Sequence, residues 1–178
     1  MTKVIKIVKL LCLGVVIILA FRWFIFPYVI DPHISKYKFR EFLSALEKGE
    51  VKKAADYVHY YGEKHSKYSI NPDLPIITAE EEKELWVSGM NRLKEKGIDF
   101  ISHKDMRVRT DDSFTSGSVI LIIKYEERTY DIHLYAHLNR GRLSPGGVQG
   151  LGSYPHPDPT VQYIVDQINV VMPTTDPG

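Results

Sequence analysis

The chain has 178 residues, of which 44% are hydrophobic and 25% charged, so its composition excludes a wholly disordered protein. The formal net charge is +1, but four bases and no acid stand in the first 30 residues, which leaves 19 bases against 22 acids, a net charge of −3, in residues 31–178. A mildly acidic domain without a basic stripe argues against nucleic acid as a partner. The single cysteine, Cys12, excludes an intramolecular disulfide and a cysteine-based zinc site.

The N-terminal part of the chain is strongly apolar. LLCLGVVIILAF (10–21) has no polar residue, and Leu10 to Ile30 would span about 31 Å as a helix, roughly the hydrocarbon thickness of a bilayer. Lys3, Lys6 and Lys9 precede this stretch, and Trp23 and Tyr28 suit a headgroup boundary. The pattern therefore predicts a transmembrane helix in residues 1–30, with the lipid bilayer as a partner of residues 4–30.

This signal-anchor reading predicts a single-pass protein of the cell membrane, with a short cytoplasmic N-terminus and an extracytoplasmic domain. A signal peptide cleaved after Ala20 is the alternative, because the lysines and the apolar core also fit its first two regions.

Three helices are expected next. DPHIS (31–35) reads as a break after the anchor, and residues 39–49 and 51–58 then show apolar residues at helical spacing. Thr78 and Glu81 have the form of a capping box at the start of a helix that ends at Gly97. The expected buried positions are Phe39, Phe42, Leu43, Leu46, Val51, Ala54, Ala55, Val58, Leu85, Trp86, Met90 and Leu93.

After Gly97 the apolar period changes from 3.6 to 2, which indicates strands. We expect strands at 100–110, 118–126 and 129–139 and a short fourth one at 142–152, with a tight hairpin at EER (126–128). Residues 111–117 read as the connection between the first two. Residues 153–159 form a proline-rich linker, and Asp158 is the expected N-cap of a closing helix whose apolar face is Val161, Ile164, Val165 and Ile168.

Helices followed by an antiparallel meander predict an α+β domain with the helices packed on one face of a curved sheet. The predicted organisation is an anchor at 1–30, a domain at 31–152, and a linker with a C-terminal helix and tail at 153–178.

EFLSALEKGEVKKAADYV (41–58) and the paired strands in 119–152 resemble the nuclear transport factor 2-like superfamily, which includes the SnoaL-like domains. The resemblance covers about residues 36–150. It implies a cone in which a curved sheet encloses a pocket, and it leaves the function open because the superfamily contains both enzymes and scaffolds. Many relatives carry a tryptophan where this chain has Leu143, and the extra C-terminal helix is a second departure.

The strongest chemical signal is TYDIHLYAHLN (129–139). Alternation in a strand places Asp131, His133, Tyr135 and His137 on one face. His133 and His137 would then lie about 13 Å apart, too far to share one zinc ion, so no metal site is expected.

A histidine held by a carboxylate can act as a general base, which makes Asp131, His133 and Tyr135 the catalytic candidates, with His103 and Asp105 approaching from a neighbouring strand. The alternative is a polar face turned to solvent. Tyr57, Tyr61, Trp86, His103 and His137 are the candidate pocket residues, and for Trp86 and the tyrosines structural packing is the alternative.

The function that this sequence favours is therefore a membrane-anchored, non-enzymatic binding or scaffolding domain, with no cofactor and an unidentified protein or small-molecule partner. The alternative is an anchored SnoaL-like enzyme that transfers protons with Asp131, His133 and Tyr135.

Overall fold

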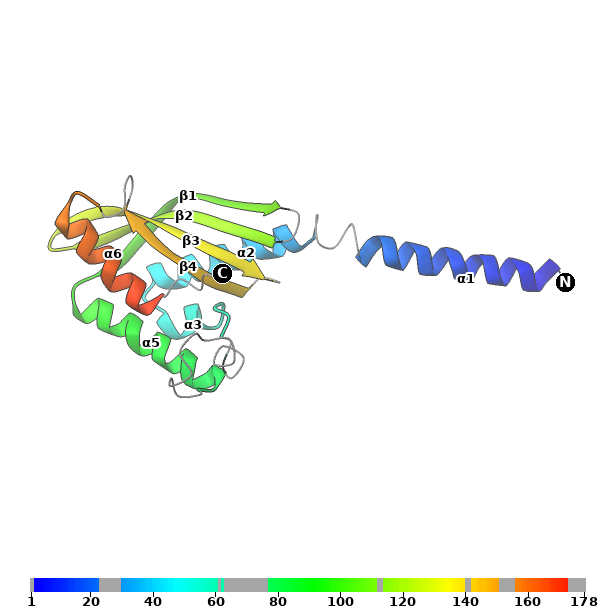
Figure 1. Ribbon diagram of the computed structural model, residues 1–178, viewed down its shortest axis with the longest axis horizontal. Helices are drawn as coiled ribbons and strands as arrows, with labels where there is room; N and C mark the ends of the chain where they lie inside the picture. The colour runs from blue at the N-terminus through cyan, green and yellow to red at the C-terminus, as the bar shows by residue number, and fades with distance from the viewer. Residues whose placement is uncertain are drawn as a thin grey trace.

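The computed structural model describes residues 2–22, 30–60, 62, 77–111, 114–139, 142–150 and 156–172. The helices come first in the chain, then the strands, and then one more helix (Figure 1). This order confirms the α+β class. The elements are α1 (Thr2–Ala20), α2 (Asp31–Glu47), α3 (Val51–Ala55), α5 (Ala79–Glu95), β1 (Asp99–Asp111), β2 (Phe114–Tyr125), β3 (Arg128–Asn139), β4 (Arg142–Gly150) and α6 (Pro159–Val171).

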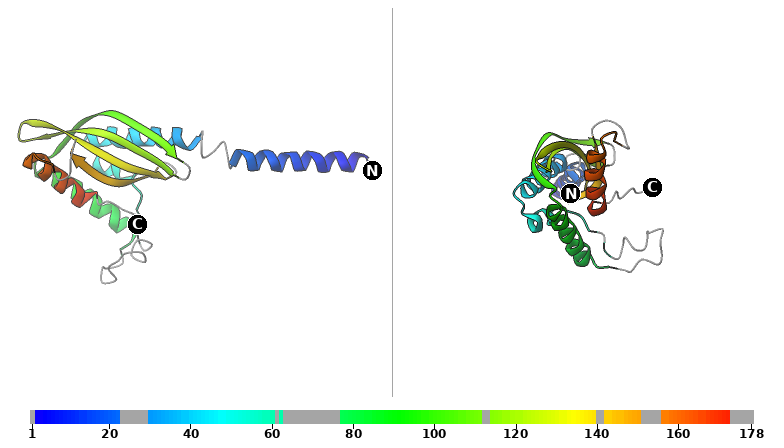
Figure 2. Two further views of the ribbon diagram at one scale, coloured as in Figure 1. Left: turned by 45° about the horizontal axis from the view of Figure 1, so that its top comes forward. Right: turned by 90° about the vertical axis from the view of Figure 1, so that its left-hand side faces the viewer.

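The four strands form one antiparallel sheet in the order β1-β2-β3-β4, so each strand pairs with the next one along the chain. Seen from its end, the sheet curves around α2, and α5 and α6 complete the enclosure of the core (Figure 2). The fourth strand was expected to be short, but β4 pairs with β3 over the range from Ile132 to Asn139. The predicted curved antiparallel sheet with helices on one face is therefore present.

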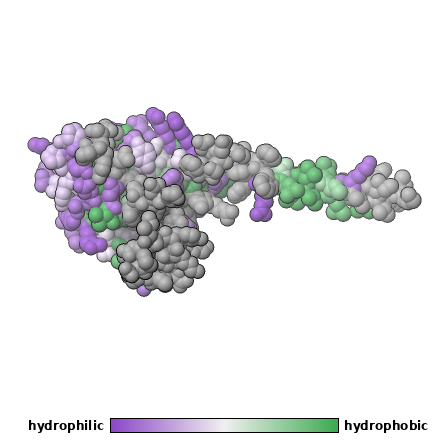
Figure 3. All heavy atoms as spheres, in the orientation of Figure 1, coloured by the Kyte–Doolittle hydropathy of each residue, from purple (hydrophilic) through white to green (hydrophobic). Residues whose placement is uncertain are grey.

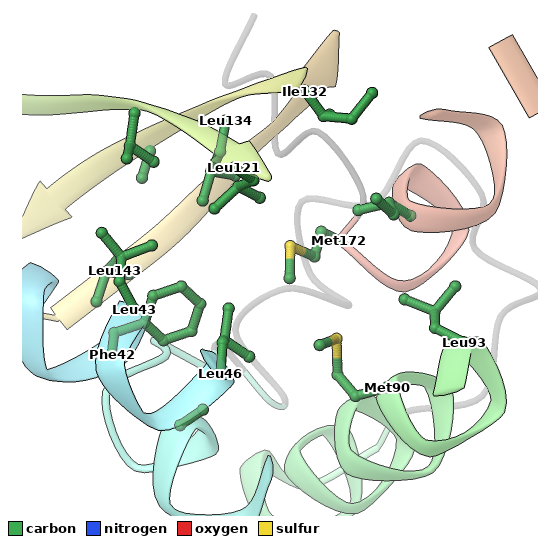
Figure 4. Packing of buried hydrophobic residues seen from close by; sticks show 14 of the residues in the cluster. Phe42, Leu43, Leu46, Met90, Leu93, Leu121, Ile132, Leu134, Leu143 and Met172 are labelled. Carbon is green, nitrogen blue, oxygen red and sulfur yellow. The ribbon is translucent and has the colours of Figure 1, made fainter. Parts of the chain in front are cut away.

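The hydrophobic core lies between this sheet and the helices. Helix α2 contributes Phe42, Leu43 and Leu46, which face Leu121, Ile132 and Leu134 of the sheet (Figure 4). Helix α5 contributes Met90 and Leu93 from the other side of the core. The fully buried members include Phe39, Phe42, Leu43, Ile123, Ile132 and Leu134. The apolar side chains that recur at helical and at strand spacing in the sequence thus pack into one contiguous core.

Two predicted helix starts are confirmed. The Thr78 hydroxyl accepts a hydrogen bond from the Glu81 amide at 3.2 Å, and the Glu81 carboxylate accepts one from the Thr78 amide at 2.7 Å, which is the reciprocal pattern of a capping box. At α6, the Asp158 carboxylate accepts from the Thr160 amide at 2.8 Å. Both caps satisfy amide groups that have no partner within the helix.

Two element boundaries and the burial of one residue differ from the sequence-based expectation. The helix α2 begins at Asp31 instead of after residue 35, because Pro32 falls in the first turn, where a missing N–H costs no hydrogen bond. The strand β2 begins at Phe114, so part of the expected connection belongs to the sheet. Leu85 is 58% exposed, since the buried stripe of α5 runs through Trp86, Gly89, Met90 and Leu93.

The predicted N-terminal transmembrane helix is wrong, and so is the signal-anchor interpretation that depended on it. Among the described residues, none of the helices combines the length and the apolar character needed to cross a bilayer. The uninterrupted apolar part of α1 is Leu10–Ala20, about 16 Å of helix against a hydrocarbon core of about 30 Å, and three lysines precede it. Trp23 and Tyr28 lie outside the described residues.

The helix α1 lies apart from the sheet and the other helices (Figure 1 and the left view of Figure 2). Its large apolar side chains are exposed, Leu10 to 74%, and they form the green stretch in Figure 3.

The C-terminal helix α6 shares the core of the preceding domain. Ile164, Val165 and Ile168 are fully buried, as is Met172 directly after the helix. These side chains pack with the sheet and with α5, so residues 161–172 belong to the same folded unit as the segment 31–152.

Candidate functional site

The sheet has two faces of different character. On β2, Val119, Leu121 and Ile123 are buried against the helices, while Ser116 and Ser118 lie half-buried on the opposite side. The same alternation on β3 buries Ile132, Leu134, Ala136 and Leu138. We call the side of the sheet opposite to the helices the polar face. It carries the polar side chains of Arg107 and Arg109 on β1 and of Asp131, His133, Tyr135 and His137 on β3. The four β3 residues are those that the sequence predicted to share one face.

A hollow of about 580 Å³ lies on the polar face. Its floor is the part of β2 around Ser116 and Ser118, and its two walls are long side chains from β1 and β3. We call this hollow the β2 trough. It is lined by Asp105, Arg107, Arg109, Ser116, Gly117, Ser118, Ile120, His133, Tyr135, Ala136 and His137.

The trough exists because short side chains stand between long ones. The register places Ser118 between Arg107 and Tyr135, and places Ser116 between Arg109 and His137. Neighbouring strands lie about 4.8 Å apart, so each of these rows is roughly 10 Å wide at the backbone. Two serines in the middle of a sheet flanked by arginines and aromatic rings therefore leave an open channel along β2.

A bulge in β1 puts the two arginines on this face. Asp105 and Met106 together stand opposite one residue of β2, between the pairs Lys104–Ile120 and Arg107–Ser118. Asp105 takes a positive φ of 54° at this point. Had the strand continued regularly from Lys104, Arg107 would stand opposite Gly117 on the buried side. The extra residue shifts the alternation and brings both guanidinium groups to the trough.

His133 and Tyr135 form a contact pair on the β3 wall. The Tyr135 hydroxyl lies 3.2 Å from Nδ1 of His133, and the two ring centroids are 4.8 Å apart. Tyr135 is 40% exposed and His133 is half-buried. Together they present ring surface and hydrogen-bonding atoms toward the trough.

Asp131, the third catalytic candidate, lies on the same face but is engaged elsewhere. Its carboxylate pairs with Nζ of Lys104 on β1 at 2.6 Å. The carboxylate-held histidine that the sequence suggested is found instead at His103, whose Nδ1 lies 2.5 Å from the carboxylate of Glu47 in α2. His103 pairs in register with buried Leu121, so it belongs to the helix side of the sheet. The structure therefore separates His103 from His133.

The remaining pocket candidates are placed as follows. Trp86 is buried in the core, 6.3 Å from the ring of Phe42. Tyr57 is half-buried against the core, and its carbonyl accepts from the Leu143 amide at 2.8 Å, which ties residues 57–59 to β4. Tyr61 lies outside the described residues, and His137 lines the β2 trough.

The electrostatics of the trough are positive. Two guanidinium groups face one carboxylate, that of Asp105, so the lining has a formal charge of +1 with neutral histidines. None of the ion pairs within the described residues involves Arg107 or Arg109. Both arginines are exposed, and their charge is available to a ligand.

A second and larger hollow, about 760 Å³, lies between α3 and α5. Its bases and acids are equal in number, and Lys83 is paired with Asp56 at 2.9 Å. The pairing raises the pKa of Lys83 through a hydrogen bond and the charge of Asp56. Balanced and paired charges on two helix surfaces are typical of a solvated face, so we place the candidate site in the smaller trough.

Sequence reasoning missed the two arginines and the two serines. The alternating patterns Arg-Val-Arg (107–109) and Ser-Gly-Ser (116–118) predict that the two arginines share one face of a sheet and that the two serines do as well. Which face this is depends on the bulge at Asp105 and on the pairing of β1 with β2. In the described ranges, no group of three or more histidine, cysteine, aspartate or glutamate side chains is placed to hold a metal ion. The chain matches no protein-family model and no curated protein sequence.

Proposed function

We propose that this protein is a non-enzymatic binding domain that holds a small ligand in the β2 trough. The observation that carries the proposal is the convergence of five long polar side chains, from two strands, over a floor of two serines. A hollow of about 580 Å³ lies within the usual range for small-molecule sites, roughly 300–1,000 Å³.

Binding is favoured over proton transfer by the position of Asp131. A general base of the expected kind needs a carboxylate to orient the histidine, and Asp131 instead neutralises Lys104. Tyr135 is the partner that His133 has on the polar face. The Tyr135 hydroxyl orients the imidazole ring, and its oxygen can also accept a hydrogen bond from a ligand.

Proton transfer is the second candidate, and the 3.2 Å contact between the Tyr135 hydroxyl and Nδ1 of His133 favours it. The contact leaves Nε2 as the ring nitrogen that would act on a substrate. In that case His133→Ala would abolish conversion of a compound bound in the trough, whereas in a binding domain the retained compound is recovered unchanged from both proteins.

We also propose that the domain is related to the nuclear transport factor 2-like domains. It is supported by helices that precede an antiparallel meander and by a sheet that curves around α2. The pocket that such a cone implies lies on the helix side, where Phe39, Phe42 and Leu43 are buried. The proposed ligand site is on the other side of the sheet, so it does not depend on the relationship.

The test blocks the β2 trough with a bulky side chain and measures whether the protein still retains a ligand. Full-length wild-type protein, Ser118→Trp and the control Ser88→Trp are equilibrated by dialysis against a small-molecule extract, and the retained compounds are identified by mass spectrometry. Ser88 is exposed on α5 and lines the hollow between α3 and α5, so the control adds the same side chain to the other hollow.

We expect a compound that wild type and Ser88→Trp retain and that Ser118→Trp loses, with all three proteins unfolding at similar denaturant concentrations. Equal retention by Ser118→Trp, or retention by none of the three, would contradict a ligand site in the trough.

A further inference from the structure

We propose that the ligand of the β2 trough carries an oxyanion, a phosphate or a carboxylate, which Arg107 and Arg109 bind together. This inference rests on the proposed function and names the chemical class of its ligand. The oxyanion would lie over Ser116 and Ser118, with the rest of the molecule toward the rings of β3.

The spacing of the arginines suits one shared anion. They are two residues apart beyond the bulge and pair with Ser118 and Ser116, so both project from β1 to the same face. Such positions are about 6.6 Å apart along a strand, and the long arginine side chains can converge from there on one group. Guanidinium groups donate hydrogen bonds in a planar fork that matches carboxylate and phosphate oxygens.

The surrounding charges leave this pair unneutralised. Lys104 and Asp131 neutralise each other at 2.6 Å beside the trough. Asp105 is then the one carboxylate among the lining residues, opposed by two guanidinium groups. Neither arginine takes part in an ion pair in the part of the chain that the structure describes. A bound anion would therefore balance the excess positive charge of Arg107 and Arg109.

The floor and the far wall add donors and ring surface. Hydroxyl groups of Ser116 and Ser118 stand between the arginines and the β3 wall, and each can donate one hydrogen bond to an oxyanion. The His133–Tyr135 ring pair offers apolar surface to the body of a ligand. This arrangement favours an aromatic compound with an anionic group over a free inorganic ion.

The test uses full-length protein and phenyl phosphate, with benzoate as the carboxylate probe and phenol as the neutral one. Binding is measured by calorimetric titration for wild type, Arg107→Gln, Arg109→Gln and the control Arg92→Gln. Arg92 is an exposed arginine of α5, on the helix side of the molecule, and its substitution removes the same charge away from the trough.

We expect each trough substitution to weaken binding of phenyl phosphate about tenfold or more, because each removes a charged hydrogen-bond donor. Arg92→Gln should change it less than about twofold, phenol should bind at least about tenfold more weakly, and added salt should weaken binding of the anions. A stronger response to phenyl phosphate identifies a phosphate, and a stronger response to benzoate identifies a carboxylate.

The inference is overturned if neither anion binds, if phenol binds as tightly as the anions, or if Arg92→Gln weakens binding as much as the trough substitutions. It also fails if Ser118→Trp leaves anion binding unchanged, since the anion would then lie outside the trough. Failure here together with a compound retained in the dialysis experiment overturns the oxyanion and leaves the binding function standing. Failure of both removes the trough as a ligand site.

Discussion

At the scale of single residues, close contacts decide what each position tolerates. Gly117 of β2 faces the core directly beneath the ring of Phe39, and a Cβ at this position would lie 2.8 Å from Cε1 and 3.0 Å from Cδ1 of that ring. Phe39 is fully buried, so its ring has little room to yield. The contact between α2 and the centre of the sheet therefore depends on a residue without a side chain.

We expect Gly117→Ala to lower the free energy of unfolding by about 1–3 kcal/mol, because the added methyl group overpacks the core. Urea denaturation measures the change. In the double variant Gly117→Ala with Phe39→Leu the smaller side chain should recover part of the loss, so the two changes will be less than additive. Strict additivity would show that the ring contact is not the cause.

Tyr60 supplies a prediction on pH. Burial raises the pKa of its phenol above the ordinary 10.0, and the negative charges of Glu82, Asp56 and Glu80 raise it further. The folded state thus favours the neutral phenol. Its contribution is constant below about pH 10, where the unfolded chain also keeps the proton, and is lost as the pH rises above that value and the unfolded chain ionises.

Tyr60→Phe removes this ionisation, so the variant should gain stability relative to wild type between pH 10 and pH 11. The hydroxyl of Tyr60 is buried and forms no hydrogen bond among the described residues, so little is lost at pH 8. Urea denaturation at both pH values measures the difference, and Tyr37→Phe, at a residue 63% exposed, is the control. A difference between Tyr60→Phe and wild type that stays constant with pH would contradict the shift.

At the scale of elements, turn and bulge geometry set the register of the sheet. The hairpin between β2 and β3 closes with Glu126 and Glu127, whose φ angles are 47° and 62°. Two positive φ angles in a two-residue loop define the turn type that favours Asn-Gly. The sequence predicts the tight hairpin at 126–128, whereas the strain on two glutamates is visible only in the backbone.

Replacing Glu126 by Asn and Glu127 by Gly should raise the free energy of unfolding by about 1–2 kcal/mol, because both residues adopt positive φ at lower cost. The surface ion pair of Glu127 with Lys124, 3.2 Å, is lost at little cost. Substituting both positions by Gln removes the same charges and keeps the strain, and it should have little effect. Thermal unfolding that is equal for the two double variants would rule out relief of strain.

The helices show the same division between local and non-local information. The stripes of α2 and α6 and the two caps follow from local periodicity and from side-chain hydrogen bonds within one turn, and the structure confirms them. In α5 the expected Trp86, Met90 and Leu93 are buried, but Leu85 is exposed and Gly89 is buried as well. A Cβ on Gly89 would lie 2.8 Å from a methyl group of Val171 in α6, a contact that local periodicity does not predict.

At the scale of the whole molecule, α6 is part of the core. Ile168 is fully buried there, whereas Val170 on the same helix is 78% exposed. We expect Ile168→Ala to lower the free energy of unfolding by about 2–5 kcal/mol through a cavity in the core. Val170→Ala should stay within about 0.5 kcal/mol of wild type.

Urea denaturation followed by tyrosine fluorescence and by circular dichroism checks this prediction. Both probes should report one shared transition in each protein, because α6 unfolds with the sheet. A loss for Ile168→Ala no larger than that for Val170→Ala, or a separate transition of the helix, would show that the C-terminal segment is an independent appendage.

The transmembrane prediction failed at this same scale. It counted apolar residues from Leu10 to Ile30, but α1 ends at Ala20, so its uninterrupted apolar part is only Leu10–Ala20. Hydropathy over a window measures composition, while a span requires one continuous apolar helix of sufficient length.

The sequence by itself determined the α+β class, the order of helices and strands, the two capping motifs and most of the buried stripes. These depend on periods of 3.6 and 2 and on hydrogen bonds between residues close in the chain. Only the tertiary structure decided the candidate site. Arg107 and Arg109, Ser116 and Ser118, and Tyr135 and His137 come from three strands, and pairing and one bulge bring them into common rows. Register depends on contacts between distant residues, and a shift of one position would send these side chains to the other face.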